Sequence, residues 1–220
     1  MNDRKIAFII CVNNKRLYKK AVDYIKKLYI PDNYSIDIIV IEHAVSMTGG
    51  YNKGIDLSDA KYKVYLHQDV FIINKNFIRD ILEIFIKNNY VGLIGVIGAR
   101  DIPSSGIWWQ SYNKEGKVFD SHAGRMELLN FQNDESKHIM VNALDGLIMI
   151  TQYDIPWRED VFDGWHFYDL SQCMEFKRKG YKILIPYQEK PWCIHDCGLV
   201  NLSDYDRYRA LFLKEYIDEL

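Results

Sequence analysis

Runs of apolar residues alternate with amphipathic segments through the first 98 positions. Ile6–Val12 and Ile36–Ile41 are apolar at nearly every position, which is the pattern of strands buried on both faces. Between them, Lys15–Leu28 carries apolar residues at helical spacing, and Pro31-Asp32-Asn33 ends that segment. Strands of this kind alternating with helices predict an α/β domain whose sheet is mostly parallel and flanked by helices.

The same alternation continues to residue 98. A third strand is expected at Tyr62–Leu66 and a fourth at Val91–Gly98, with a helix between them that Asn74 caps. The buried stripe of this helix comprises Phe77, Ile81 and Phe85. The intervening stretch Ser46–Gly54 contains glycines and is assigned to no element.

Regular patterning is lost between Ala99 and Val141, where Gly, Pro, Ser, Trp and Tyr dominate. A loop of this length in a compact domain usually serves function, so we expect an irregular functional segment here. The elements expected beyond it are strand Leu147–Ile150, helix Leu170–Arg178, strand Tyr181–Ile185 and a last helix to Ile217. Ser203 and Asp206 predict a capping box at the start of that last helix.

Composition indicates an ordinary globular protein without a nucleic-acid-binding surface. The 220 residues include 28 basic and 30 acidic side chains, so the formal net charge is −2. The N-terminus lacks a signal-peptide layout, no apolar run is long enough to cross a membrane, and the four cysteines suit free thiols. We therefore expect a cytoplasmic protein, at most peripheral at the membrane face. Aromatic residues reach 14%, and aromatic rings often line sites for sugar-like ligands.

The end of the third predicted strand is the first candidate site. His67 and Asp69 are two residues apart, so in an extended backbone they point the same way and can share one cation. Ligands of open α/β sheets bind at the carboxyl ends of strands, where this pair lies. The alternative is an exposed histidine followed by an aspartate in a turn.

Two later segments are further candidates. Cys193, His195 and Cys197 suggest a zinc site, but the spacing is narrower than in zinc modules. Alternatively, His195 reaches a metal held elsewhere, or it has no role. The segment Glu159–Leu170 concentrates carboxylates and a histidine at the start of a helix. These side chains suit a general base, whereas aspartates at a helix start also serve as plain caps.

Several nucleotide-binding signatures are missing. The sequence has no G-x-x-x-x-G-K or G-x-G-x-x-G loop and no G-x-S-x-G elbow. P-loop, dinucleotide-binding and α/β-hydrolase functions therefore lose support. Phosphates bound without such a loop need a metal ion.

In combination these motifs resemble the nucleotide-sugar glycosyltransferases of the GT-A fold, in the family 2-like group and its bacterial "glycosyltransferase-like family" branch. The first half resembles the group's A-R-N-x-G-I … A … Y … L-D-x-D run through Gly50-Tyr51-Asn52-Lys53-Gly54-Ile55, Ala60, Tyr62 and Leu66-His67-Gln68-Asp69. The second half resembles G … G-F-D-E … E-D-x-D-L … R … G-Y … H through Asp145-Gly146-Leu147, Phe162-Asp163, Asp169-Leu170, Gly180-Tyr181 and His195. The resemblance extends from Ile6 to about Gly198.

Two positions depart from the family pattern. His67 replaces the first aspartate of the D-x-D motif, and imidazole is a competent ligand for Mn²⁺. Phe167 falls where the family has its catalytic aspartate, and it cannot accept a proton. The resemblance therefore implies that a neighbouring residue is the base, and the candidates are Asp169, His166 and Asp163.

The resemblance implies a single GT-A domain over 1–220, with a nucleotide-binding half, 1–98, and an acceptor-side half, 99–220, in which 99–141 is the acceptor loop or lid. It further implies Mn²⁺ or Mg²⁺ held by Asp69, His67 and His195, and inverting transfer from a UDP-sugar to a carbohydrate or other hydroxyl acceptor. The implied nucleotide-binding residues are Cys11, Val12, Asn13, Glu42, Asn52, Gly54, His67 and Gln68. The implied sugar- and acceptor-binding residues are Trp108, Trp109, Asp145, Gly146, Trp165 and Trp192.

Two other functions remain open. The chain could be a catalytically degenerate nucleotide-sugar-binding module for glycan assembly, which Phe167 favours. A nucleotidyltransferase is the third possibility, although the segment Asn13-Asn14-Lys15-Arg16 lacks the glycines that such an enzyme needs.

Overall fold

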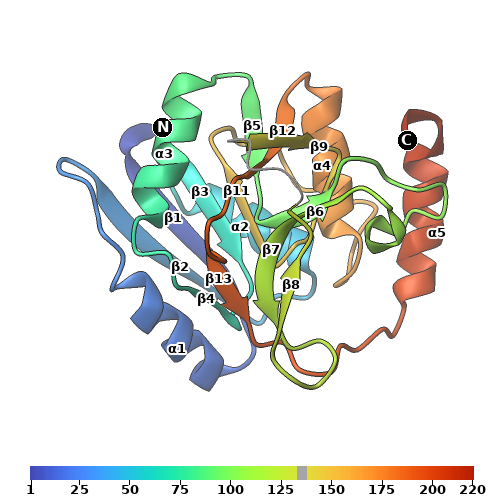
Figure 1. The fold of residues 1–220 in the computed structure, drawn as a ribbon, viewed down its shortest axis with the longest axis horizontal. Helices are drawn as coiled ribbons and strands as arrows, with labels where there is room; N and C mark the ends of the chain where they lie inside the picture. The colour runs from blue at the N-terminus through green and yellow to red at the C-terminus, as the bar shows by residue number, and fades with distance from the viewer. Residues whose placement is uncertain (133–137) are drawn as a thin grey trace.

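A central seven-stranded sheet organises the molecule in the computed structural model, which describes residues 1–132 and 138–220 (Figure 1). The order of its strands is β2-β1-β3-β11-β5-β12-β9. Their bounds are β1 Asn2–Val12, β2 Ser35–Glu42, β3 Ala60–Leu66, β5 Val91–Ile94, β9 His138–Val141, β11 Ile148–Thr151 and β12 Lys182–Pro186.

Most strands of this sheet run in one direction. β1 is parallel to β2 and β3, and β5 is parallel to β12. β11 lies antiparallel between β3 and β5, and β9 lies antiparallel at the edge beside β12. The first and second halves of the chain therefore share one sheet, and the expectation of a mostly parallel sheet is confirmed.

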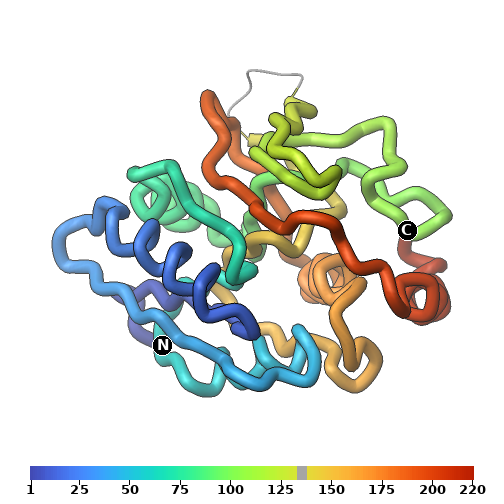
Figure 2. Tube along the Cα trace, turned by 90° about the horizontal axis from the view of Figure 1, so that it is seen from below, coloured from blue at the N-terminus to red at the C-terminus, as the bar shows by residue number. Residues whose placement is uncertain are grey.

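Helices cover both faces of this sheet (Figure 2). Ile6, Phe8 and Ile10 of β1 pack in the core formed with α1 (Lys15–Ile25) and α3 (Phe77–Lys87). Ala7 and Ile9, which alternate with them, pack in the core formed with α2 (Met47–Asp56) and α4 (Tyr168–Arg178). This alternation of side chains explains why β1 is apolar at nearly every position.

A smaller sheet lies beside the central one and has the order β10-β6-β7-β13-β4, with β8 paired to β7. Its strands are β4 Val70–Ile72, β6 Ile97–Ala99, β7 Lys114–Asp120, β8 Glu127–Asn130, β10 Ala143–Leu144 and β13 Cys193–His195. In Figure 2 the red-orange chain that follows β13 crosses between the green-yellow segment of β7 and β8 and the orange segment before α4. This sheet joins residues from distant parts of the sequence.

The structure corrects four expectations about local structure. Val91–Gly98 is not one strand, because Gly95 and Val96 separate β5 from β6, which belong to different sheets. Residues 46–54 are largely helical, and the Ser46 side chain caps α2 by accepting from the Gly49 N–H. Asn76, rather than Asn74, precedes α3. The segment 99–141 is not irregular throughout, since it contains β7, β8 and β9; its residues 133–137 lie outside the described residues.

The last helix, α5 (Tyr205–Tyr216), lies at the right of Figure 1 and packs on α4. The expected capping box is wrong: Asp204 precedes the helix in a left-handed conformation, and the Ser203 hydroxyl donates to Asn201 instead. In the described part of the chain, no helix has the length and apolar character needed to cross a membrane.

Close packing between α2 and β1 generates a prediction about Gly54. A Cβ atom at Gly54 would lie 2.4 Å from Cγ2 of Ile9, which is too close for a carbon–carbon contact. Gly54→Ala should therefore lower the free energy of unfolding by about 1–3 kcal/mol, as overpacked cores do. Urea denaturation measures it, with Lys53→Ala, on the exposed side of α2, as the matched control. A Gly54→Ala protein as stable as Lys53→Ala would contradict this packing.

Candidate active site

A cavity of about 530 Å³ lies where β1, β2 and β3 end. Because these strands are parallel, their carboxyl ends meet at one edge of the sheet, the usual place for ligands in open α/β folds. Six of the predicted nucleotide-binding residues line the cavity: Cys11, Val12, Asn13, Glu42, His67 and Gln68. Its volume is in the range of small-molecule and cofactor pockets.

Asn52 and Gly54, also expected at the nucleotide, do not line this cavity. The Asn52 side chain donates to the Trp157 carbonyl at 2.9 Å and accepts from the Trp157 N–H at 2.8 Å. Gly54 faces Ile9 of β1. Both residues therefore hold α2 in place, against Trp157 and β1.

Gln68 stabilises one wall of the cavity through hydrogen bonds. Its side-chain carbonyl accepts from the backbone N–H groups of Asn13, at 3.0 Å, and Asn14, at 2.7 Å. The segment that follows β1 is thus tied to the segment that follows β3. Lys15 also lines the cavity and forms an ion pair with Glu42 at 3.2 Å. The sequence predicted Lys15 only as the first residue of a helix. The pattern of neighbouring residues does not show which way the Lys15 side chain points.

His67, Asp69 and His195 form a group of ligand atoms within 4.8 Å of one another. Oδ1 of Asp69 and Nε2 of His195 are 3.6 Å apart, and both are buried. Neither atom has a hydrogen-bond partner among the described residues. With a proton on Nε2 the two atoms form an ion pair, and without it they are buried polar atoms that lack partners. The pair therefore fits either that proton or a divalent cation that would bind between them.

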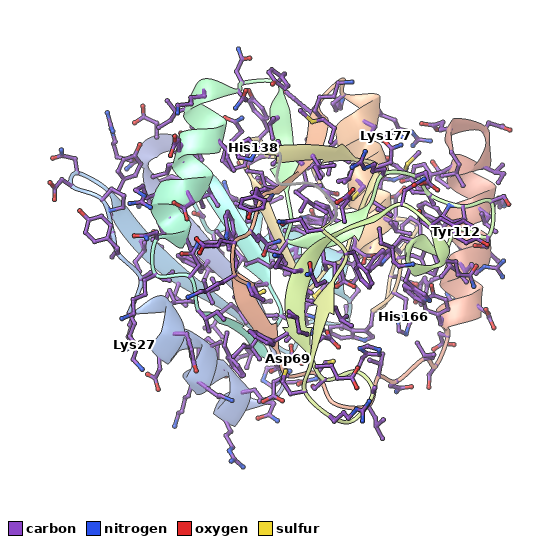
Figure 3. The ribbon with its side chains drawn as sticks, in the orientation of Figure 1. Lys27, Asp69, Tyr112, His138, His166 and Lys177 are labelled. Carbon is purple, nitrogen blue, oxygen red and sulfur yellow. The ribbon has the colours of Figure 1, made fainter. Side chains whose placement is uncertain are left out.

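The smaller sheet brings these residues together. His195 of β13 is paired with Val70 of β4 on one side and with Asp120 of β7 on the other. Asp69 immediately precedes β4, and its carbonyl accepts from the Asp196 N–H at 2.9 Å. Figure 3 labels Asp69 beside the end of β13. The fold thus brings together three possible ligands whose outermost members, His67 and His195, are 128 residues apart in the sequence.

The two imidazoles of the group differ in charge. Burial lowers the pKa of His67, which favours the neutral, metal-binding form. The hydroxyl of Tyr168 lies within hydrogen-bond distance of Nε2 of His67 and fixes the ring. Burial alone would lower the pKa of His195, but the hydrogen bond with Asp120 and the charge of Asp69 raise it. Without a cation, His195 therefore carries a proton that pairs with these carboxylates.

Asp169 is the predicted base whose environment suits that role. Burial and the nearby charge of Asp145 raise its pKa to about 7. Its carboxylate accepts from the N–H groups of Gly146, at 3.0 Å, and Leu170, at 2.9 Å, which fix its position in the first turn of α4. The Asp145 side chain accepts from the Leu147 N–H at 2.9 Å. A carboxyl group with a pKa near neutrality is matched to proton transfer at physiological pH.

The other two candidate bases lie elsewhere. Nε2 of His166 is 3.0 Å from the Ser203 carbonyl, and Figure 3 shows His166 close to α5. Asp163 is exposed, accepts from the Tyr208 hydroxyl at 2.8 Å and pairs with Arg207 at 3.5 Å. None of the three candidate bases, Asp169 included, lines the cavity, so the distinction between them rests on burial and on the raised pKa of Asp169.

The predicted sugar-stacking tryptophans fall into two groups. Trp108 and Trp192 are core residues with 5% and 7% of their surface exposed, so they have no free ring face for a sugar. Trp109 and Trp165 are each 46% exposed, and Trp165 lines the cavity. The Trp109 ring packs on Tyr205 with a centroid distance of 5.5 Å. Burial and, secondly, the charge of Asp169 raise the pKa of Tyr205.

The zinc alternative for Cys193, His195 and Cys197 does not match the structure. Cys193 is fully buried in the hydrophobic core, and its thiol belongs to no group of ligand atoms among the described residues. Asp120, His195 and Cys197 do form a second group within 4.8 Å. Sequence reasoning missed Asp120 because it lies in the segment where patterning is lost.

Comparison with known proteins identifies the class. The profile of the family described as "Glycosyltransferase like family" matches residues 7–216, so the chain belongs to this family. No curated protein matches the sequence.

Solved structures share the fold, which is the GT-A fold. A crystal structure of S. aureus TarS 1-349 in complex with UDP matches with a TM-score of 0.59 and 11% identity, over 98% of this chain and 67% of that chain. The mannosyltransferase PcManGT from Pyrobaculum calidifontis, in complex with GDP-Man and Mn²⁺, matches with a TM-score of 0.61 and 12% identity, over 100% and 66%. The chain thus spans about two thirds of these structures and 40% of a longer TarS chain.

The coupling between Asp145 and Asp169 can be measured directly. Asp145→Asn removes a negative charge next to Asp169, so the pKa of Asp169 should fall below about 7. It should remain above that of an exposed aspartate, because burial is unchanged. Carboxyl ¹³C chemical shifts followed against pH report this value, and an unchanged titration midpoint would contradict the proximity of the two charges.

Proposed function

We propose that the protein is a glycosyltransferase that moves a sugar from a UDP-sugar to a hydroxyl acceptor with a divalent cation, inverting the anomeric configuration. One observation carries the proposal: the unpartnered Oδ1 of Asp69 and Nε2 of His195 lie beside a nucleotide-sized cavity at the carboxyl ends of the parallel strands. Membership of the glycosyltransferase-like family supports it. So do the neighbours described in complex with UDP and with GDP-Man.

The cavity residues suit a uridine diphosphate. The apolar end of β1, at Cys11 and Val12, offers one wall for a flat base, and Glu42 offers a carboxylate that accepts an imide N–H. Lys15, now paired with Glu42, carries a positive charge that a diphosphate attracts. Trp165 lies at the cavity with its ring partly free and suits contact with the sugar.

Asp69, His67 and His195 are the residues that would hold the cation. Two imidazoles and one carboxylate favour Mn²⁺ over Mg²⁺, because Mg²⁺ prefers oxygen ligands. A cation held there neutralises the negative charge that develops on the leaving diphosphate. Tyr168 keeps His67 oriented.

Asp169 is the proposed base. Its carboxylate takes the proton of the acceptor hydroxyl while the hydroxyl oxygen forms a bond to the anomeric carbon and the bond to the diphosphate oxygen breaks. The electron pair of the broken bond leaves with the UDP, so atoms and charge balance and the configuration inverts. Gly146 and Leu170 orient the Asp169 carboxylate through their N–H groups, and Trp109, beyond Tyr205, offers an exposed ring to the acceptor.

Loss of the carboxylate of Asp69 should remove cation-dependent nucleotide binding. Asp69→Ala takes away one of three ligands and should weaken UDP binding in the presence of Mn²⁺ by at least about 100-fold, whereas Asp23→Ala on the exposed face of α1 should leave it unchanged. Isothermal titration calorimetry with and without Mn²⁺ measures both. Equal affinities for the two variants would rule out Asp69 as a cation ligand.

Comparison of three variants identifies the base. Asp169→Asn should lower kcat by about 10²–10⁴-fold while UDP binding is retained, and His166→Ala and Asp163→Asn should change kcat by less than tenfold. Because the base acts when ionised, the wild-type rate should fall as pH drops through about 7, the pKa of Asp169, and this dependence should vanish in Asp169→Asn. A full effect in His166→Ala with none in Asp169→Asn would reassign the base.

A second function is favoured by Phe167, which lies where the resemblance has a catalytic aspartate. Its ring is buried against Tyr205 and Phe212, at centroid distances of 4.9 Å and 5.4 Å, so no carboxylate occupies this position. The chain would then be a nucleotide-sugar-binding module without turnover. Hydrolysis of a UDP-sugar with Mn²⁺ separates the two: tight UDP binding without any turnover supports the module.

A further inference from the structure

The ring of His195 is held from both sides by carboxylates. Its Nδ1 lies 2.8 Å from Oδ2 of Asp120, and its Nε2 lies 3.6 Å from Oδ1 of Asp69. Only 11% of the His195 side chain and 8% of the Asp120 side chain are exposed. The first distance is a hydrogen bond, whereas the second joins two atoms that have no hydrogen-bond partner.

The hydrogen bond with Asp120 decides which nitrogen of His195 is free. A carboxylate can only accept, so Nδ1 of His195 carries the proton whether the ring is neutral or charged. The lone pair of the neutral ring is then on Nε2, the atom that faces Asp69. This is the arrangement in which an imidazole binds a cation while its second nitrogen donates to a carboxylate.

Asp120 is itself fixed by its surroundings. Its Oδ1 accepts from the backbone N–H of His122 at 2.7 Å and lies 2.6 Å from Nδ1 of the same residue. The two carboxylate oxygens of Asp120 therefore have different partners, since one faces His195 and the other faces His122. Only a group with two acceptor oxygens at this position can serve both partners.

Strand pairing enforces this contact. Asp120 ends β7 and is the direct neighbour of His195 in the parallel pairing of β7 with β13. Asp120 lies in the acceptor-side half of the chain, and Asp69, beyond His195, lies in the nucleotide-binding half. The end of β7 is therefore part of the surroundings of the cation ligands.

We propose that Asp120 is a positioning residue that holds His195 in the orientation and tautomer needed to bind the cation of the glycosyltransferase site. The inference rests on the proposed function, because it takes Asp69 and His195 as cation ligands. Asp120 touches neither substrate nor cation and acts through the His195 ring.

A separate cation bound by Asp120, His195 and Cys197 is the competing explanation. The distances disfavour it. Nδ1 of His195 and Oδ2 of Asp120 are already at hydrogen-bond distance, and the Cys197 sulfur is 4.0 Å from Oδ1 of Asp120. The competing explanation requires Cys197 as a ligand, whereas the positioning role does not.

Titration of the full chain with Mn²⁺ alone tests the inference. Asp120→Asn keeps the size of the side chain but replaces one of the two acceptor oxygens with an NH₂ donor. Because His195 and His122 meet different oxygens of Asp120, the amide cannot accept at both positions. Its affinity for Mn²⁺ should fall by about 10–100-fold. Asp101→Asn, which changes another carboxylate of the acceptor-side half, and Cys197→Ser should both retain wild-type affinity. Thermal unfolding monitored for each variant shows that folding is retained.

The outcomes separate this inference from the function on which it rests. Wild-type affinity in Asp120→Asn would overturn the positioning role alone, and wild-type protein that binds no Mn²⁺ would overturn the cation site as well. Two ions per chain, with one lost in Cys197→Ser, would establish the competing site and overturn the inference. ¹⁵N spectra of the wild-type protein need no variant: a proton on Nδ1 of His195, in the neutral or the doubly protonated ring, supports the inference, and a ring protonated on Nε2 alone contradicts it.

Discussion

The buried pair of Asp69 and His195 is the constraint on which the functional interpretation of this fold depends. Two polar atoms that face each other at 3.6 Å without hydrogen-bond partners are expensive to bury unless a ligand or a shared proton compensates them. The smaller sheet imposes the arrangement, because β13 lies between β4 and β7 and aligns the end of each strand. The grouping of these ligand atoms is thus a consequence of strand pairing rather than of a contiguous motif.

The sequence predicted the parts of the fold and site that local patterns encode. β1, β2, β3 and α1 were predictable because apolar runs and helical spacing are local, and Asp69 stood out because it follows a buried strand. Asp120 and Lys15 could not be found this way. Asp120 meets His195 across 75 residues through the pairing of β7 with β13, and the orientation of Lys15 depends on how α1 packs beside β2.

Some residues that the sequence alone does not distinguish have different side-chain environments in the structure. Asn52 and Gly54 lie in the motif expected to bind the nucleotide, yet the structure uses them to fix α2 against Trp157 and β1. Asp163 and Asp169 are the same residue type in the same segment of the sequence. Of the two, only Asp169 is buried next to another carboxylate, which gives it a pKa of about 7. Asp169, the proposed base, lies two residues after Phe167, on the first turn of α4.

A crystal structure of the protein with UDP and Mn²⁺ tests the account most directly. We expect anomalous density for one Mn²⁺ between Asp69 and His195, with the uracil at the ends of β1 and β2 and the diphosphate beside the metal. Manganese at Asp120 and Cys197, or UDP bound away from the cavity at the carboxyl ends of these strands, would contradict it.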